Sequence, residues 1–374
     1  MIKSLFVADT EAPWIRSLVQ AMPQGVKVCG FRVRSLLSSP IGVCAQLRKF
    51  GHTEVISGDW TDTWTSIPGW NRAYDLSSWL ITLQIRRKIR ELGQPDAILF
   101  TLPWYAKVAA SLHGTTTVYY AHDTFRHYGW DNSKVIPLEK HLLDKCSIGF
   151  AVAKMVVADL EEMTSTPIKY FPMATNWQFG QASTDGEAVA EKDLALIPRP
   201  IVGCVGQINK AAYDWNLIEH LSKNFPNASF VFIGPKFKEP PGPESSRLES
   251  VFSLPNVAWL GPKPHAHLPA YLKQFDVCLN PLGISDHNNR RSPLRLFDYL
   301  TTDRPILSTA IAEAYNHLPL IKIARSDSEF CQLLEEALKT RFAADLEQRK
   351  RYINSNTWQM RAEELCSLVS QVAK

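Results

Sequence analysis

The stretch RRSPLRLFDYLTTDRPILST, residues 290 to 309, carries the clearest indication of the fold. Ser292 is a favoured N-cap residue, and Pro293 suits the first position of a helix, where its missing N–H costs nothing. The spacing therefore predicts a short helix that starts at these two residues and leads into an apolar strand, PILST. A helix followed by a buried strand is the repeating element of a parallel α/β sheet.

The same alternation of short apolar runs and amphipathic helical stretches extends through both halves of the chain. Strands are expected at SLFVAD, VKVCGF, TEVIS, DAILF, TTVYYA and IGFAVA, and the pattern restarts at PIVGCVGQI. Between them, residues 178–200 lose periodicity and gather Gly, Ser, Asp and Pro, as linkers do. We predict two Rossmann-like α/β domains that face each other across a cleft, at residues 1–178 and 179–355. A C-terminal helix at residues 356–374 is expected to pack back on the first domain.

The composition fits this prediction and excludes several classes of protein. A chain of 374 residues with 45% hydrophobic and 21% charged residues can build two folded domains. The net charge of +4 is too mild for a nucleic-acid partner. No apolar run approaches the roughly 18 residues of a membrane span, and the amino terminus has the pattern of a first strand, which favours a cytoplasmic location. Seven cysteines without Cys-x-x-Cys spacing argue against structural zinc.

The helix predicted to start at Ser292 and Pro293 also suggests a binding site. The amides of Leu294 and Arg295, the helix dipole and the guanidinium of Arg295 could seat a phosphate or diphosphate. Asp298 could accept hydrogen bonds from a ribose diol. The alternative is an ordinary capped helix with an internal ion pair between Arg295 and Asp298. Gly206, at the end of PIVGCVGQI, indicates either close approach of the backbone to a ligand or only a tight turn.

The carboxyl half resembles a known family over an ordered set of segments: IVGCVGQI, NASFVFIGP, VAWLGPKP, SPLRLFDYL and NTWQMRAEEL. It is similar to the donor domain of glycosyltransferases with the GT-B fold that build polysaccharides, of the teichuronic-acid and xanthan glucuronosyltransferase kind. The resemblance implies a nucleotide-diphosphate sugar, UDP- or GDP-linked, as donor. It implies that the following residues bind this donor: Gly206, Gln207, Lys263, Ser292, Pro293, Leu294, Arg295 and Asp298.

Within that set, the resemblance assigns each position a part of the donor. Gly206 and Gln207 would approach the phosphates or the sugar, and Lys263 would lie near the nucleobase. The segment 292–295 would hold the diphosphate, and Asp298 the ribose. This chain departs from the family pattern, because serine replaces the common asparagine at 292, arginine the usual lysine at 295, and aspartate the expected glutamate at 298.

The amino half resembles the family less closely, with its best match at VYYAHDTFRHYGW. Asp123 occupies the position of an aspartate in that family. It would take the proton from an acceptor hydroxyl if the enzyme inverts the anomeric centre, and it would position substrate if the enzyme retains it. The alternative for Asp123 is a turn residue that caps the following loop.

Two further groups of side chains in the first half each have two interpretations. The first is four tryptophans in a short polar region: Trp60, Trp64, Trp70 and Trp79. They indicate either a groove for a sugar acceptor or aromatic cover for the edge of a core. The second is a basic helix with Ile85 and Ile89 that carries Arg86, Arg87, Lys88 and Arg90. It is typical either of loose attachment to an anionic membrane leaflet or of a plain surface helix.

Together these expectations describe a glycosyltransferase of the hexosyltransferase type that needs no metal and no further cofactor. It would move a sugar from the nucleotide-diphosphate donor to a saccharide or lipid-linked acceptor in cell-surface polysaccharide synthesis. It would work in the cytoplasm or at the inner face of the membrane. The alternatives are a nucleotide-sugar epimerase of the same fold and a catalytically silent nucleotide-binding subunit.

Overall fold

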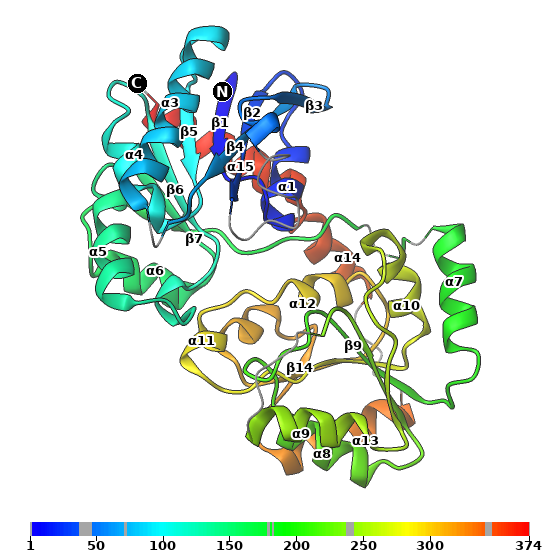
Figure 1. Cartoon of the computed structure of the whole chain (residues 1–374). Coiled ribbons are helices and arrows are strands. Elements are labelled where there is room, and N and C mark those ends of the chain that lie inside the picture. The colour runs from blue at the N-terminus through cyan, green and yellow to red at the C-terminus, as the bar shows by residue number, and fades with distance from the viewer. Residues whose placement is uncertain are drawn as a thin grey trace. The chain divides into compact units, whose positions relative to one another are not determined.

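A computed structural model of the chain describes residues 2–36, 47–70, 73–177, 180–181, 183–236, 243–340 and 346–373 (Figure 1). Its internal contacts divide the chain into two compact units. Unit 1 comprises Met1–Pro172 and Trp358–Lys374, and unit 2 comprises Met173–Thr357. The boundaries after residues 172 and 357 differ by a few residues from those drawn from the sequence, after 178 and 355. The predicted α/β class is confirmed, since each unit is built around a mainly parallel sheet.

The sheet of unit 1 has the strand order β3-β4-β2-β1-β5-β6-β7-β8. Its strands are β1 (Ser4–Ala8), β2 (Lys27–Ser35), β3 (Thr53–Ser57), β4 (Trp60–Ile67), β5 (Ala97–Phe100), β6 (Thr117–Ala121), β7 (Ile148–Ala151) and β8 (Ile168–Tyr170). Only β3 is antiparallel to its neighbour. The sequence did not indicate β4, because WTDTWTSI lacks an apolar alternation although nearly all of it is buried. The direction of strand order reverses between β1 and β5, where ligands bind in open α/β sheets.

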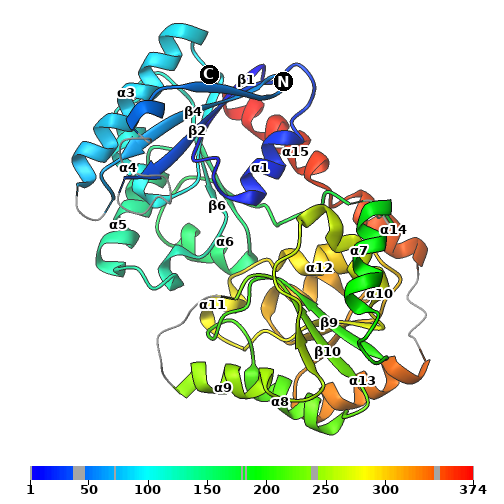
Figure 2. The same ribbon diagram turned by 45° about the vertical axis from the view of Figure 1, so that its right-hand side comes forward.

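Helices cover both faces of this sheet. They are α1 (Pro13–Gln20), α3 (Tyr74–Leu92), η1 (Pro103–Tyr105), α4 (Ala106–Ala110), η2 (Phe125–His127), α5 (Asn132–Leu143), α6 (Lys154–Glu161) and α15 (Trp358–Val372). Figures 1 and 2 show α3, α4 and α5 on one side and α1 with α15 on the other. Because both faces are covered, strands β5 and β6 are buried along their whole length, as expected for a parallel sheet.

The sheet of unit 2 has the order β11-β10-β9-β12-β13-β14. Its strands are β9 (Ile201–Val205), β10 (Ser229–Ile233), β11 (Val257–Trp259), β12 (Val277–Asn280), β13 (Ile306–Thr309) and β14 (Lys322–Ala324). All neighbouring pairs are parallel. This order starts in the middle of the sheet and reverses between β9 and β12, which makes that point the expected ligand position of unit 2.

The helices of unit 2 also lie on both faces of its sheet. They are α7 (Thr184–Leu194), α8 (Trp215–Asn224), α9 (Pro243–Phe252), η3 (His265–His267), α10 (Leu268–Gln274), α11 (Asp286–Asn289), α12 (Leu294–Tyr299), η4 (Ala312–His317), α13 (Asp327–Thr340) and α14 (Leu346–Asn354). In Figure 2, α8, α9 and α13 lie below the sheet, and α10 and α12 above it.

Helix α7 corrects the linker that the sequence predicted over residues 178–200. Ser183 is its N-cap, and the Ser183 hydroxyl accepts a hydrogen bond from the Gly186 N–H at 3.2 Å. Ala190 and Leu194 are buried in the core of unit 2. The Gly, Ser and Asp residues that resemble a linker are therefore the start of a helix.

Candidate functional site

Two glycines end the neighbouring strands β9 and β10 at the carboxyl edge of unit 2. Gly206 and Gly234 have φ angles of 137° and 145°, which side chains rarely adopt. A Cβ on Gly234 would lie 1.9 Å from the Gly206 carbonyl oxygen, and a Cβ on Gly206 would lie 2.6 Å from Nη2 of Arg295. Glycine is thus required at 206, both by the turn and because the backbone there lies against a guanidinium.

Arg295 lies on the first turn of α12, beside the point where the strand order of unit 2 reverses. Its Nη1 lies 3.3 Å from the Cys204 Sγ, and its guanidinium carbon lies 5.0 Å from the centroid of the Tyr213 ring. Burial acts to lower the pKa of Arg295, but Tyr213, Cys204 and Tyr299 together shift it above its ordinary value. The Arg295 guanidinium stays charged, as arginine does in proteins. Among the described residues, no carboxylate pairs with it. The internal ion pair that the sequence left open is therefore not formed, and this half-buried cation can attract an anion.

The start of α12 differs from the prediction. Pro293, and not Ser292, occupies the N-cap position, so the helix begins at Leu294 and has no side-chain cap. The Ser292 hydroxyl instead accepts a hydrogen bond from the Met173 N–H at 3.3 Å. Ser292 does not cap the helix because its hydroxyl binds the backbone of Met173, the first residue of unit 2. With only six residues in α12, the charge of Arg295 matters more here than the helix dipole.

Asp298 is buried on the same short helix, with 8% of its surface exposed. Its Oδ1 accepts a hydrogen bond from the Thr175 hydroxyl at 3.1 Å. Burial raises the pKa of Asp298 to about 7, against the lowering effects of Thr175 and Arg295. Thr175 had no signal in the sequence, because the contact joins residues that are 123 positions apart.

The other two predicted donor residues lie further along the same edge. Gln207 follows Gly206 and is exposed. Lys263 follows β11, and its Nζ lies 2.6 Å from the Asp193 carboxylate on α7. The Tyr271 hydroxyl also donates to Asp193, and Lys263 and Tyr271 together lower the pKa of that carboxyl. The Lys263 ammonium is thus engaged in packing α7 against the rest of unit 2.

Asp123 and His122 follow β6 at the carboxyl edge of the unit 1 sheet, and both are buried. The Asp123 Oδ1 accepts a hydrogen bond from the Thr124 N–H at 2.8 Å, as the capping interpretation expects. Nδ1 of His122 is buried and finds no hydrogen-bond partner among the described residues. Burial lowers the pKa of His122 to about 4, although Asp123 opposes this, so the imidazole is neutral at pH 7.

Asp9 is a further candidate that the sequence reasoning missed. It follows β1 at the reversal point of unit 1, and its φ of 74° is the only positive φ of a non-glycine residue in the described part of the chain. Burial raises the pKa of Asp9 to about 7, although it keeps partial access to solvent. Tyr105, after β5, has a buried hydroxyl without a partner among the described residues, and the nearby Asp9 charge adds to burial in raising its pKa. The sequence did offer one signal for this candidate, which is an acidic residue directly after the first predicted strand.

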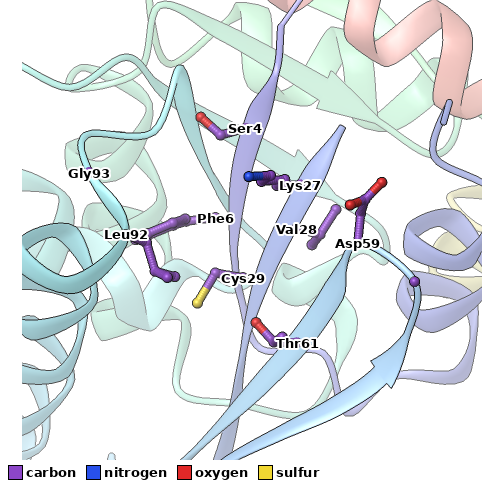
Figure 3. A pocket seen from close by; sticks show the side chains of 10 residues that line it. Ser4, Phe6, Lys27, Val28, Cys29, Asp59, Thr61, Leu92 and Gly93 are labelled. Atoms are coloured by element: carbon purple, nitrogen blue, oxygen red, sulfur yellow. The ribbon is translucent and has the colours of Figure 1, made fainter. Parts of the chain in front are cut away.

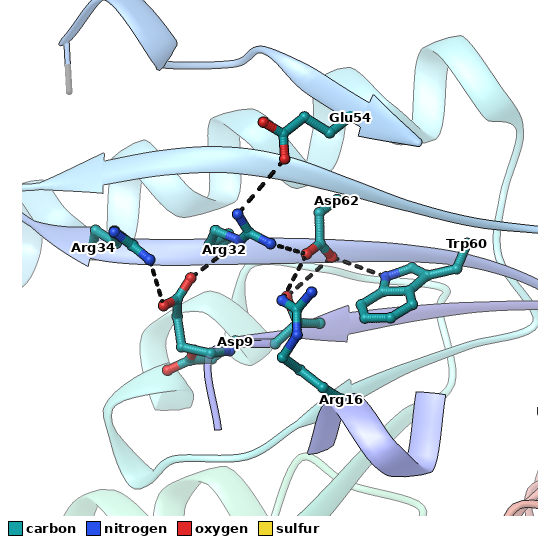
Figure 4. Close-up of polar contacts among 9 residues, drawn as sticks. Asp9, Arg16, Arg32, Arg34, Glu54, Trp60 and Asp62 are labelled. Carbon is teal, nitrogen blue, oxygen red and sulfur yellow. Dashed lines mark hydrogen bonds and ion pairs between the residues drawn. The ribbon is translucent and has the colours of Figure 1, made fainter. Parts of the chain in front are cut away.

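An ion network lies next to Asp9, between the carboxyl half of β2 and the start of β4 (Figure 4). Its centre is Asp62, whose side chain is fully buried. Asp62 accepts hydrogen bonds from four groups: Arg16 Nη1 at 3.4 Å, Arg32 Nη2 at 3.2 Å, Trp60 Nε1 at 2.9 Å and Thr10 Oγ1 at 3.0 Å. This network supplies the polar partners that allow a polar strand such as β4 to be buried.

The network also settles the place of two of the four tryptophans. Trp60 and Trp64 are buried on β4 and do not line an open groove. The cations of Arg32, Arg34 and Lys49 lie 4.7, 4.9 and 4.4 Å from the centroid of the Trp64 ring. Of the two interpretations that the sequence left open, Trp60 and Trp64 therefore fit aromatic cover for the edge of a core and not a groove for a sugar acceptor.

A pocket of about 260 Å³ lies at the opposite, amino-terminal ends of β1 and β2 in unit 1 (Figure 3). Ser4, Lys27 and Asp59 line it together with Leu92 and Gly93 from the end of α3. Its place at the amino ends of the strands separates it from Asp9 and Asp123. Over the ranges that the structure describes, no group of three or more His, Cys, Asp or Glu side chains is placed to hold a metal ion.

Comparison with known proteins agrees with this arrangement. Residues 210–367 match the model of a family described as glycosyl transferase-like. A Bacillus subtilis (strain 168) protein, TuaH, provisionally named a teichuronic acid biosynthesis glycosyltransferase, is 29% identical over 109 residues. That match covers 29% of this chain and 26% of the relative, so the chain matches about a quarter of the relative's length. The predicted resemblance to such proteins is confirmed over this part of the chain.

Solved structures extend the similarity to both units. The chain has the GT-B fold. HepE of Anabaena, solved with UDP and glucose, has a TM-score of 0.72 at 11% identity and covers 99% of this chain and 100% of its own. Sucrose-phosphate synthase of Thermosynechococcus elongatus gives 0.71 at 13% identity, with 99% of each chain covered. The UDP-forming α,α-trehalose-phosphate synthase of Burkholderia xenovorans gives 0.71 at 13% identity, with 100% of each chain covered.

Proposed function

We propose that the protein is a glycosyltransferase that moves a sugar from a nucleotide-diphosphate donor to a saccharide or lipid-linked acceptor. The observation that carries the proposal is Arg295, a cation with no carboxylate partner in the described part of the chain, packed on Gly206 where the unit 2 sheet reverses its strand order. The family match over residues 210–367 supports it. Similar structures solved with UDP favour a UDP-linked donor over a GDP-linked one.

Unit 2 would bind the donor. Arg295 would bind the diphosphate, because a guanidinium offers two parallel N–H donors to phosphate oxygens. Asp298 would accept from the ribose with Oδ2, which has no hydrogen bond among the described residues, while Thr175 holds Oδ1. Gln207 and the backbone at Gly206 would contact the phosphates or the sugar. Lys263 would reach the nucleobase only if it left Asp193, which makes it the weakest of the predicted contacts.

Unit 1 would bind the acceptor. In the transfer, an acceptor hydroxyl oxygen forms a bond to the anomeric carbon, the bond from that carbon to the diphosphate breaks, and the hydroxyl proton goes to a carboxylate. We propose Asp123 or Asp9 as that carboxylate if the reaction inverts the anomeric centre. Asp9 has a pKa close to neutrality and partial solvent access, both of which suit a general base.

The leaving nucleoside diphosphate gains negative charge as the bond breaks. Arg295 can stabilise this charge in the role that a magnesium ion plays in other transferases. Transfer is therefore proposed to proceed without added metal, and activity in the presence of EDTA would test this. The proposal also includes a role in cell-surface polysaccharide synthesis, in line with the name of the B. subtilis relative. It further includes a location at the inner face of the membrane.

The proposal is tested by incubating the protein with UDP-, GDP- and dTDP-sugars while thermal stability and nucleotide release are followed. A transferase should be stabilised by its donor and release nucleotide slowly to water, and faster with an acceptor. Release of an isomerised sugar would identify an epimerase instead, and no stabilisation by any donor would identify a silent subunit. Asp9→Asn and Asp123→Asn then distinguish the two carboxylates, since the variant of the true base should bind donor normally but transfer no sugar.

A further inference from the structure

The outer face of α3 in unit 1 exposes an apolar stripe. Leu76, Trp79 and Leu83 are 48%, 59% and 39% exposed, although they are large hydrophobic residues. Their spacing of three and four residues places them on one side of the helix. The opposite side carries Ile81 and Ile85, which are fully buried against the unit. Figures 1 and 2 show α3 on the outside of the unit 1 sheet.

The stripe continues into a basic segment along the same helix. Arg86, Arg87 and Arg90 are exposed on the turns that follow Leu83. Arg87 pairs with Glu91 at 2.8 Å, and the Arg86 Nη2 donates to the Ser111 carbonyl at 2.8 Å, so both guanidinium groups are held on this face.

The charges that neighbouring elements add leave the face positive. Lys107 of α4 pairs with Asp75 at the start of α3, and these two charges cancel. Glu91 also pairs with Lys88, whose side chain is nearly buried. On the exposed face, Glu91 is the one carboxylate that pairs with these three arginines among the described residues, and the face carries a net positive charge.

We infer that this face of α3 seats the protein on an anionic membrane surface. An apolar stripe with a tryptophan, followed by a cluster of arginines, matches a helix that lies in the interface plane with its apolar side among the lipid headgroups. The positive charge of the face is complementary to anionic lipid. A second copy of this chain fits less well, because two such faces would bring their arginines together.

The position of the stripe gives it a consequence for the acceptor. Tyr74, in the first turn of α3, lies 6.3 Å from the Trp104 ring, which follows β5 at the carboxyl edge of the sheet. Asp9 and Asp123 follow β1 and β6 at that same edge. A membrane in contact with the first turns of α3 would therefore lie close to the candidate acceptor site. This favours a lipid-linked acceptor and rests, for that step alone, on the proposed function.

The test is cosedimentation of the full chain with vesicles, without donor or acceptor. Binding is expected to vesicles of phosphatidylcholine mixed with phosphatidylglycerol, to be weaker with phosphatidylcholine alone, and to fall with salt. The triple variant Leu76→Ser, Trp79→Ser, Leu83→Ser should bind at least about tenfold more weakly, because it loses the apolar area that enters the interface. The matched control is Leu196→Ser, a leucine of unit 2 that is 95% exposed.

A charge variant tests the second half of the inference. Arg87→Gln with Arg90→Gln should weaken binding roughly 25-fold, at about fivefold for each charge near an anionic surface. Lys339→Gln with Lys350→Gln, two exposed cations of unit 2 in similar helical ion pairs, should leave it unchanged.

Three outcomes would overturn the inference: no binding to either kind of vesicle, equal binding by the triple variant and the native chain, or a native chain that is a dimer in solution together with a triple variant that is a monomer. UDP binding measured on the same samples keeps this test separate from the proposed function. A chain that binds vesicles but no nucleotide would refute the glycosyltransferase proposal and leave the membrane surface standing.

Discussion

Replacement of Arg295 is the most direct test of the donor site. The guanidinium contacts the Cys204 sulfur and the Tyr213 ring, and no carboxylate of the described residues forms a direct ion pair with it. A hydrogen bond to a charged group contributes ~1.5 to 3 kcal/mol, so Arg295→Ala should weaken UDP binding by ~10- to 150-fold. Thermal stability should fall only modestly, because the substitution removes the positive charge that lowers the pKa of the buried Asp298 carboxyl but breaks no direct ion pair.

Two further variants sharpen the measurement by calorimetry. Arg295→Met keeps an unbranched apolar side chain and removes the charged guanidinium, so it should lose as much affinity as Arg295→Ala. Arg199→Ala removes a guanidinium from a half-exposed ion pair with Asp276 in the same unit and should bind UDP normally. An unchanged dissociation constant for both Arg295 variants, with folding intact, would refute the reasoning and remove Arg295 from the site.

Four other substitutions have expected outcomes. Asp123→Asn should spare UDP binding and abolish sugar transfer, and full activity in a transfer assay would exclude it as the base. Asp62→Ala should lower the unfolding free energy by about 3 kcal/mol, because it leaves the buried Trp60 N–H and Thr10 hydroxyl without their acceptor; calorimetry that finds no fall in Tm would contradict this. The folded-state pKa of Asp298 is about 7, above its ordinary 3.8, so its contribution to stability is complete below the lower value and is lost as pH rises through the higher one. Asp298→Asn should therefore reduce the fall in Tm over this pH range. The part of the unfolding free energy that stops depending on pH is at most roughly 4 kcal/mol, and an unaltered pH profile would argue against a raised pKa. Gly206→Ala should cost about 1–3 kcal/mol in stability and weaken UDP binding, because its Cβ displaces Arg295; wild-type affinity would show that the guanidinium can move without loss.

The sequence predicted those parts of the fold whose burial follows directly from their own apolar residues. Strands such as β9 and β10 are buried on both faces, and their continuous apolar runs predicted a parallel sheet. Strand β4 could not be predicted, because its burial depends on arginines from β2 and α1 that neutralise Asp62. Helix α7 was mistaken for a linker for a similar reason, since few of its residues are apolar and most face solvent.

The candidate site divides in the same way. Arg295 and Asp298 could be singled out because they share one short segment with a proline before them. Their partners Tyr213 and Thr175 could not, because only the folded sheet brings them together across long stretches of chain. Asp9 could have been considered from its place directly after the first strand, but its positive φ and raised pKa arise from packing and leave no mark in the local sequence.

Helix α15 has a consequence for how the protein is made. It comes after unit 2 in the chain but belongs to unit 1, where Trp358, Leu365 and Val369 are buried and the Ser370 hydroxyl accepts from the Ile2 N–H at 2.9 Å. During synthesis, the sheet of unit 1 therefore keeps one apolar face incompletely covered until all of unit 2 has been translated. Any truncation after Thr357 would strip a helix from the half of the molecule that was made first, and an isolated acceptor half would have to be expressed together with this distant segment.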